Sequence, residues 1–361
     1  MPVYLDYNAT APVHPKAIAE VQKWLTVPAN PSSVHSFGRE AKRQLENSRK
    51  IIANYISAWE NEIIFTGSGT ESNITALRAF PENRLLVSAV EHVSVLKNAE
   101  NVERVPVDSN GVVDLAKLDG LLAENSTPSL VSIMLANNET GVIQPIAEIS
   151  QICKKHGALL HCDAVQALGK IAVDFSLLGA DMITISSHKF GGVAGSAALV
   201  VKNNLAVKPL LTGGGQELGR RAGTENIAAI AGFSAAIEAI DFEYMKNLRL
   251  WLNELENEVQ NKGGIVFAKN VHRLPNTSCL VMPNVSNEVQ LIDFDLNGFA
   301  VSSGSACSSG RIEKSHVLSA MGIDTKLANC AIRVSCGWNT TENQIKDFTK
   351  AWLKLIRKLG D

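Results

Sequence analysis

The sequence predicts an α/β fold in which a mostly parallel sheet is covered by helices on both faces. Buried strands are indicated by short apolar segments at 62–66, 85–89, 129–136, 158–162 and 182–185. Segments with helical patterns lie between them, and this regular alternation is typical of parallel sheets. Polar residues follow the end of each strand. In open α/β sheets, ligands bind at the carboxyl ends of the strands, so we expect a site there.

The composition is that of an ordinary globular protein with room for about two domains. Of the 361 residues, 45% are hydrophobic and 19% are charged. The 34 basic and 36 acidic side chains nearly cancel, so nothing indicates binding to nucleic acid or to an anionic membrane. No apolar run is long enough to span a membrane, and the N-terminus lacks a signal-peptide pattern. We therefore expect a cytoplasmic protein whose partner is a small molecule or another protein.

The six cysteines are too sparse for a disulfide scaffold, they form no Cys-x-x-Cys pair, and no metal site is predicted. Cys307 differs from the others because glycine and serine surround it in the segment 300–310. A reactive thiol must be accessible and able to ionise. The sequence therefore predicts a mobile loop that carries a reactive Cys307.

The first third of the chain contains a candidate phosphate site. Helices are expected at 15–24 and 36–55, with a turn-rich loop between them in which Asn30 is either a ligand or an ordinary polar residue. The strand at 62–66 leads into the glycine-bearing segment 67–73 and then a helix. Glycine lets the backbone approach an anion, and the amides of a helix start favour phosphate. The segment is neither a P-loop nor a full G-x-G-x-x-G fingerprint, so a simple tight turn remains the alternative.

Lys189 is the central candidate residue of the chain. It follows the strand at 182–185 and precedes a glycine-bearing loop, where its amine is placed to form a Schiff base with a carbonyl. A solvated loop lysine is the alternative. The strand ends should gather further polar side chains in the same crevice, namely His92, Asn138, Asp163 and Gln166.

The second part of the chain is predicted to begin a smaller domain near Tyr244. We expect helices at 245–261 and 341–359 and strands at 276–282, 299–303 and 331–335. Before it, the arginines and Thr224 of the segment 220–226 could meet a phosphate or form a solvated turn. Arg333 could grip a carboxylate with two hydrogen bonds, or form a structural salt bridge.

Together these stretches resemble the cysteine desulfurases, pyridoxal-phosphate (PLP) enzymes of fold type I in the class V aminotransferase group. The most specific segments are 30–35, 70–73, 137–141, 161–166, 187–189, 221–224 and 302–307. The resemblance implies a large domain, residues 15–244, with a mostly parallel seven-stranded sheet. It also implies a smaller α+β domain, residues 1–14 and 245–361, that carries the Cys307 loop.

The resemblance implies roles around the ring of pyridoxal 5'-phosphate. Lys189 would hold the cofactor as a Schiff base, Asp163 would stabilise the protonated ring nitrogen, and His92 would stack on the ring and move protons. Asn138 and Gln166 would contact the phenolic oxygen of the cofactor.

Contacts to phosphate and substrate follow from the same resemblance. The phosphate ligands would be Gly69, Thr70, Ser186 and His188. Thr224 would reach the phosphate from a second subunit, so a homodimer is expected. Asn30 and Arg333 would bind the substrate carboxylate.

The implied activity converts L-cysteine to L-alanine. Lys189 would remove the α-proton, and the Cys307 thiolate would attack the substrate sulfur to form a persulfide that passes to an acceptor protein. The implied protein is a sulfur-mobilising transferase of the kind that serves iron–sulfur cluster biogenesis, although clusters, thiolated RNA and a specialised pathway are all compatible destinations for the sulfur.

The sequence departs from the family pattern in three places. Gly192-Val-Ala-Gly195 replaces Gly-Pro-x-Gly, Trp338 stands where relatives often have arginine, and no long tail follows the last helix. The acceptor therefore stays open. The alternatives are another class V PLP enzyme, such as a selenocysteine lyase or an aminotransferase, or a catalytically idle relative that acts as a partner subunit.

Overall fold

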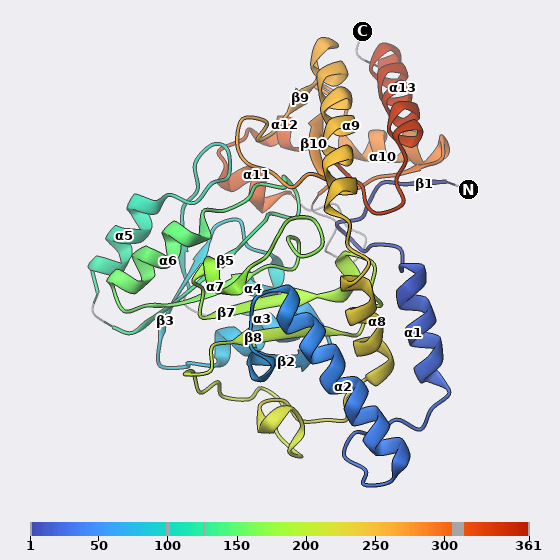
Figure 1. The fold of residues 1–361 in the computed structure, drawn as a ribbon. Coiled ribbons are helices and arrows are strands. Elements are labelled where there is room, and N and C mark those ends of the chain that lie inside the picture. Colours follow the sequence, from blue (N-terminus) through green and yellow to red (C-terminus); the bar gives the residue numbers. More distant parts are fainter. Residues whose placement is uncertain (1, 99–101, 126, 305–313, 360–361) are drawn as a thin grey trace.

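The computed structural model contains a large sheet region and a smaller region that includes both termini (Figure 1). It describes residues 2–98, 102–125, 127–304 and 314–359. Cys307 and most of the segment expected to form its loop lie outside these residues.

Within the described residues, the large sheet has seven strands in the order β2-β8-β7-β6-β5-β3-β4. The strands are β2 (Ile63–Thr66), β3 (Arg84–Ser88), β4 (Glu103–Val105), β5 (Ser129–Met134), β6 (Leu159–Asp163), β7 (Met182–Ser186) and β8 (Ala197–Val201). Strands β3 to β7 pair in parallel, whereas β8 runs antiparallel to both of its neighbours. The carboxyl ends of β5, β6 and β7 therefore lie at one edge.

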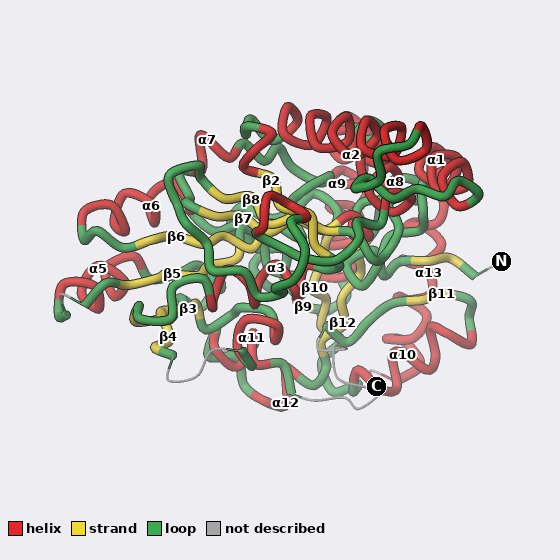
Figure 2. The backbone as a smooth tube through the Cα atoms, turned by 90° about the horizontal axis from the view of Figure 1, so that it is seen from below, coloured by secondary structure: helices red, strands yellow, loops and turns green. Residues whose placement is uncertain are grey.

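Helices cover both faces of this sheet, and Figure 2 shows the strands between the two helix layers. The helices of this region are α1 (Pro15–Leu25), α2 (Ser36–Tyr55), α3 (Gly69–Arg78), α4 (Val93–Leu96), α5 (Leu115–Ala123), α6 (Ile146–Lys155), α7 (Phe175–Leu178) and α8 (Ile227–Ile237), with short 3-10 turns η1 (Glu60–Glu62), η2 (Ser187–Lys189) and η3 (Gln216–Gly219). Side chains alternate along each strand, so Ile183 joins the core under α2 and α8 while Met182 joins the core under α3.

The smaller region has its own core. It contains β1 (Val3–Tyr4), α9 (Phe242–Asn261), β9 (Ile265–Val266), β10 (Thr277–Val281), α10 (Asn287–Leu296), β11 (Phe299–Ala300), α11 (His316–Ala320), α12 (Thr325–Ala328), β12 (Ala331–Ser335) and α13 (Glu342–Leu359). Strand β1 pairs with β11, so the N-terminal segment joins the C-terminal part of the chain. Leu5 shares a core with Leu252 and Trp352.

We propose the domain division expected from the sequence, 15–244 against 1–14 plus 245–361, and the separate cores support it. The boundary falls in the first turn of α9, which begins at Phe242 and so starts three residues earlier than expected. Among the described residues, no helix combines the length and the apolar character needed to cross a membrane.

The prediction of a mostly parallel sheet with helices on both faces is confirmed. Two of its strands were not among those expected. Strand β4 has only three residues, with Glu103 and Arg104 among them, and so carries little strand signal. Strand β8, Ala-Ala-Leu-Val-Val, is a continuous apolar run whose antiparallel direction depends on the preceding loop and not on its own pattern.

Candidate active site

A cavity of about 250 Å³ lies at the carboxyl ends of β5, β6 and β7, against the start of α3. It brings together nine of the residues that the sequence singled out: Gly69, Thr70, His92, Asn138, Asp163, Gln166, Ser186, His188 and Lys189. They come from five separate stretches of the chain. The shared strand direction is what collects them at one edge.

The start of α3 forms one wall of the cavity. Strand β2 ends at Thr66, and Ser68 caps the helix by accepting a hydrogen bond from the backbone N–H of Glu71 at 3.1 Å. Gly69 is the first helical residue, and a Cβ there would lie 3.0 Å from Cγ2 of Val165. The glycine therefore lets the helix approach the segment after β6, with its first amides beside the cavity. These amides and the helix dipole favour an anion.

Asp163 ends β6 and is buried in the cavity wall. Its Oδ1 accepts a hydrogen bond from the backbone N–H of Val165 at 2.9 Å, and its Oδ2 accepts one from Nδ2 of Asn73 at 2.8 Å. Both carboxylate oxygens are thus held in place. Asn73 was not singled out as a ligand in the sequence, although its position one turn after Gly69 puts it on the same helix face.

His92 caps the short helix α4, and its ring nitrogen Nδ1 is engaged by Ser94. The backbone N–H of Ser94 donates to Nδ1 at 3.1 Å, and the hydroxyl of Ser94 lies 2.8 Å away. Burial lowers the pKa of His92, and the charge of Asp163 partly opposes this shift. A neutral imidazole whose Nδ1 accepts hydrogen bonds carries its proton on Nε2.

Lys189 ends η2, the 3-10 turn that follows β7. Its Nζ donates hydrogen bonds to the backbone carbonyls of Asn8 at 2.8 Å and Ala9 at 2.7 Å. Lys189 lines the same cavity as Asp163, so the two residues share a cleft as the sequence led us to expect. The N-terminal segment contributes directly to the site, because its carbonyls receive the lysine.

His188 precedes Lys189 in η2, and its Nδ1 lies 3.2 Å from the hydroxyl of Thr10. Burial, with a smaller contribution from the charge of Lys189, lowers the pKa of His188 to about 4. Its imidazole is therefore neutral at pH 7 and can serve an anion as an N–H donor without adding charge.

Arg333 lies on β12, buried beside the cavity without lining it. Its guanidinium donates to the carbonyl of Asn138 at 2.9 Å and to Oδ1 of Asp6 at 2.6 Å. Its Nε is buried and has no hydrogen-bond partner among the described residues. The salt bridge that the sequence left as an alternative thus exists, and it leaves the N–H of the buried Nε unused among the described residues.

Two predicted ligands lie apart from the cavity of the single chain. Asn30 closes an exposed turn, where its Oδ1 accepts a hydrogen bond from the backbone N–H of Ser32 at 3.0 Å. Thr224 is exposed in the loop after η3. That loop is tied to α3 by the ion pair of Arg221 with Glu71 at 2.8 Å. Cys307 lies outside the described residues.

Comparison with known proteins places this geometry in a family. The family described as aminotransferase class V matches residues 3–348. The chain belongs to this family of PLP-dependent enzymes.

Within that family, it belongs to the cysteine desulfurases of the NifS and IscS type. It is 40% identical to the cysteine desulfurase IscS of Dictyoglomus turgidum, over 99% of this chain and 95% of that protein. A NifS-like protein from Rickettsia africae has a similar structure, with a TM-score of 0.92, 37% identity, and coverage of 99% of this chain and all of that one. SspA, solved in complex with cysteine, has a TM-score of 0.82 and 28% identity over 92% of this chain and 98% of its own.

The residues of the cavity fit PLP. An amine, a buried carboxylate and the start of a helix open onto one space of about 250 Å³, matching the aldehyde, ring nitrogen and phosphate of the cofactor. The absence of a side chain at Gly69 lets the start of α3 lie close to Val165 and Ser186, which line the same cavity.

Proposed function

We propose that this protein is a cysteine desulfurase that converts L-cysteine to L-alanine and transfers the sulfur, as a persulfide on Cys307, to an acceptor protein. The observation that carries the proposal is the meeting of Lys189, Asp163 and His92 in one cavity at the start of α3. The names of the most similar relatives agree with it.

We propose that the predicted cofactor residues hold PLP in this cavity. When bound, PLP would supply an electron sink for the electrons released at the substrate α-carbon. Asp163 would face the ring nitrogen, and its hydrogen bonds with Asn73 and Val165 would hold the carboxylate in place there. Asn138 and Gln166 would lie at the phenolic oxygen. Gly69, Thr70, Ser186 and His188 would bind the phosphate, where the neutral imidazole of His188 acts as a donor.

Protons are moved by two side chains in this proposal. Lys189 Nζ, as a neutral amine, removes the proton from the substrate α-carbon, and the carbonyls of Asn8 and Ala9 hold that nitrogen when it is not engaged. His92 is oriented by Ser94, so its Nε2 is the atom available for proton transfer.

The substrate carboxylate is assigned to Arg333. Its buried guanidinium keeps an unused N–H on Nε, and the contact to Asn138 ties it to the cavity. Asn30 is proposed as the second carboxylate ligand from its sequence motif, since the single chain keeps it in an exposed turn.

Sulfur transfer rests on Cys307, which is assigned from its sequence context. As a thiolate it would attack the substrate sulfur, forming the S–S bond of a persulfide while the carbon–sulfur bond breaks and its electrons pass to the carbon that becomes the methyl group of alanine. Thr224 would bind the phosphate from the second subunit of a homodimer.

The test is mass spectrometry of the peptide that carries Cys307, after the cofactor-loaded protein meets L-cysteine without reductant, with alanine measured in the same tube. We expect one added sulfur on Cys307 together with alanine. Cys307→Ser should lose both, whereas Cys330→Ser, a change at a buried cysteine of the smaller region, should keep both. Alanine and sulfide without the adduct would point to a lyase that does not use Cys307. Absence of both products would refute the proposal.

A further inference from the structure

Lys170 is a buried amine to which neither the sequence motifs nor the proposed function gives a role. Its side chain is only 4% exposed, and it comes shortly after the segment that carries Asp163 and Gln166. Among the described residues, no carboxylate lies within ion-pair distance of its Nζ. A buried lysine without a counter-ion is costly unless it is neutral and its N–H groups are bonded.

Among the residues that the structure describes, the Lys170 Nζ has two hydrogen-bond acceptors. Oε1 of Gln166 lies 2.5 Å away, and Oδ1 of Asn8 lies 2.8 Å away. A neutral amine has two N–H donors, and these two contacts use both of them. Burial lowers the pKa of Lys170 well below its usual value, and the charges of Lys189 and Arg333 act in the same direction.

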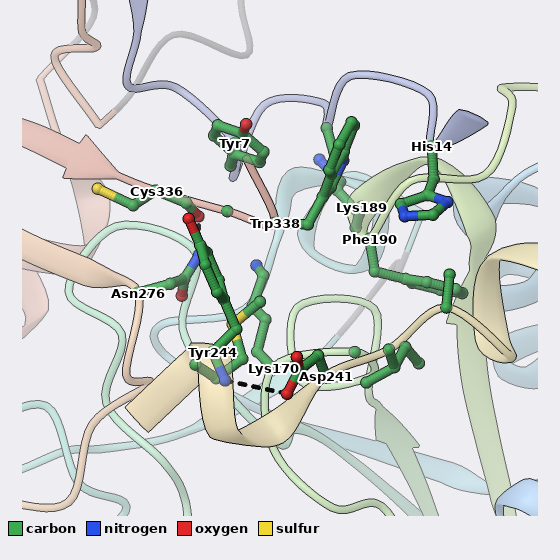
Figure 3. Close-up of a pocket in the computed structure, with 16 residues that line it drawn as sticks. Tyr7, His14, Lys170, Lys189, Phe190, Asp241, Tyr244, Asn276, Cys336 and Trp338 are labelled. Atoms are coloured by element: carbon green, nitrogen blue, oxygen red, sulfur yellow. Dashed lines mark hydrogen bonds between the residues drawn. The ribbon is translucent and has the colours of Figure 1, made fainter. Parts of the chain in front are cut away.

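A second cavity, of about 180 Å³, lies on the side of Lys170 that faces away from the candidate active-site cavity (Figure 3). Lys170 and Lys189 both line it, together with Phe190, Tyr244, Asn276 and Trp338. Figure 3 shows the Lys170 side chain between Asn276 and Phe190. This cavity contains neither Asp163 nor the start of α3, whereas Gln166 faces only the cofactor cavity. Lys170 therefore contacts Gln166 from the side of the second cavity.

The contacts of Lys170 decide which way two side-chain amides point. Because the two N–H groups of the neutral amine donate to Oε1 of Gln166 and to Oδ1 of Asn8, the oxygens of both side-chain amides face Lys170. The Nε2 of Gln166 is left as the donor, bonded to the Asn8 carbonyl at 2.9 Å. The Nδ2 of Asn8 then donates to Thr277 at 3.0 Å and to the carbonyl of Asn138 at 3.2 Å.

This network surrounds the Lys189 amine. The carbonyl of Asn8 accepts from both Gln166 Nε2 and Lys189 Nζ. The carbonyl of Asn138 accepts from both Asn8 and Arg333. A flip of the Gln166 amide would put its oxygen against the Asn8 carbonyl and leave one N–H of Lys170 without its acceptor, so Lys170 opposes the flip.

We propose that Lys170 is a positioning residue that holds the amide of Gln166 with its N–H toward the phenolic oxygen of the cofactor, an inference that rests on the proposed function through the role of Gln166. A donor at that oxygen stabilises its anionic form and so lowers the pKa of the protonated Schiff base beside it. Lys170 thereby influences the pKa of the Schiff base, which is measured from the absorbance of the bound cofactor, without contacting the cofactor.

The experiment is a pH titration of the absorbance of the cofactor-loaded protein without substrate, in the wild type and in Lys170→Met, Lys170→Arg and the control Lys202→Met. Lys202 is a half-buried lysine outside both cavities that pairs with Asp181. We expect Lys170→Met to raise the apparent pKa of the chromophore by about half to one pH unit, since a hydrogen bond of ordinary strength is lost. Lys170→Arg keeps N–H donors and adds a permanent positive charge, and the cavity behind it has room, so the apparent pKa of the chromophore in this variant should equal or fall below that of the wild type.

The same substitutions in a Gln166→Leu background separate positioning from a direct field effect. If Lys170 acts through Gln166, Lys170→Met should cause no further shift in that background. An equal shift in both backgrounds, or no shift in the single variant, would overturn the inference. Should Lys170→Met not retain cofactor, Lys170→Arg completes the cycle, and a lowering of the chromophore pKa by arginine that is equally large with and without Gln166 would also refute the inference.

These outcomes are independent of the desulfurase reaction. A wild-type protein that binds the cofactor but forms no alanine would refute the proposed function, while its titration would still test Lys170.

Discussion

Glu91 provides a sharp test of the electrostatics around the site. It lies between β3 and His92 with no exposed surface. Its Oε1 accepts hydrogen bonds from the hydroxyl of Ser88 at 2.5 Å and the backbone N–H of Met134 at 2.7 Å. Its Oε2 is buried and has no hydrogen-bond partner among the described residues. Burial, with a smaller contribution from the charge of Asp163, raises the pKa of Glu91 to about 8.

The sign of the pH dependence follows from this shift. Between pH 4.5 and 8 the folded state keeps the Glu91 proton that the unfolded state loses, so the free energy of unfolding falls as pH rises. A pKa raised from 4.5 to about 8, at about 1.4 kcal/mol per pH unit, amounts to about 5 kcal/mol across this range. The stabilisation is complete below pH 4.5 and is lost by pH 8.

Glu91→Gln removes the titration while keeping the shape of the side chain. At pH 5 we expect the variant to be less stable by about 1–3 kcal/mol, because its NH2 group places two N–H donors without an acceptor where protonated Glu91 places one O–H. The difference should then shift in favour of the variant by about 1.4 kcal/mol per pH unit up to pH 8.

The assay is urea denaturation of both proteins at fixed protein and cofactor concentrations from pH 5 to pH 8.5, because bound cofactor adds to stability. Glu258→Gln, a change at an exposed position of α9, is the control and should differ from the wild type by the same amount at every pH. A constant stability difference between Glu91→Gln and the wild type across this range would refute the buried, protonated state of Glu91.

Two further predictions concern the substrate and the wall of the second cavity. Arg333→Lys should lower kcat/KM for L-cysteine about 10–100-fold, mostly through KM. A lysine ammonium cannot keep the contacts with Asp6 and Asn138 and also offer two donors to a carboxylate. An unchanged KM in steady-state kinetics would argue against the carboxylate role. Gly169→Ala should cost about 2–4 kcal/mol in urea denaturation, because the new Cβ would lie 2.3 Å from Cβ of Phe190 at a φ of +82°. Gly195→Ala, with a φ of +94° and, among the described residues other than its chain neighbours, no atom within 4 Å of the new Cβ, should cost only about 1–2 kcal/mol. Equal losses in the two variants would mean that the contact with Phe190 has no effect.

The local pattern of the sequence was enough to predict the fold class and the edge of the sheet where the site lies. Strands β5, β6 and β7 are short, fully buried or nearly so, and polar side chains that line the cavity lie at the end of each strand or within four residues after it. Because parallel strands end at one edge of the sheet, the polar residues after them lie close together, and this does not depend on the details of packing. Asp163 and Lys189 could therefore be placed in one cavity from the sequence.

The direction of β8 and the contribution of the N-terminal segment were decided by tertiary structure. Nothing in residues 6–10 indicates that the carbonyls of Asn8 and Ala9 receive the Lys189 amine, because this contact joins segments about 180 residues apart. In sequence, Lys170 is one more lysine after a glycine. Its burial, and its two contacts to Gln166 and Asn8, arise only when the segments pack.

The sequence by itself determined the fold class, the family and the residues able to carry the chemistry, because strand alternation and short motifs are properties of neighbouring residues. Only the tertiary structure decided the protonation and orientation of those residues. The raised pKa of Glu91, the neutral His188 and the direction of the Gln166 amide depend on burial and on donors from distant segments. Desolvation and hydrogen bonding between such segments exist only in the folded chain.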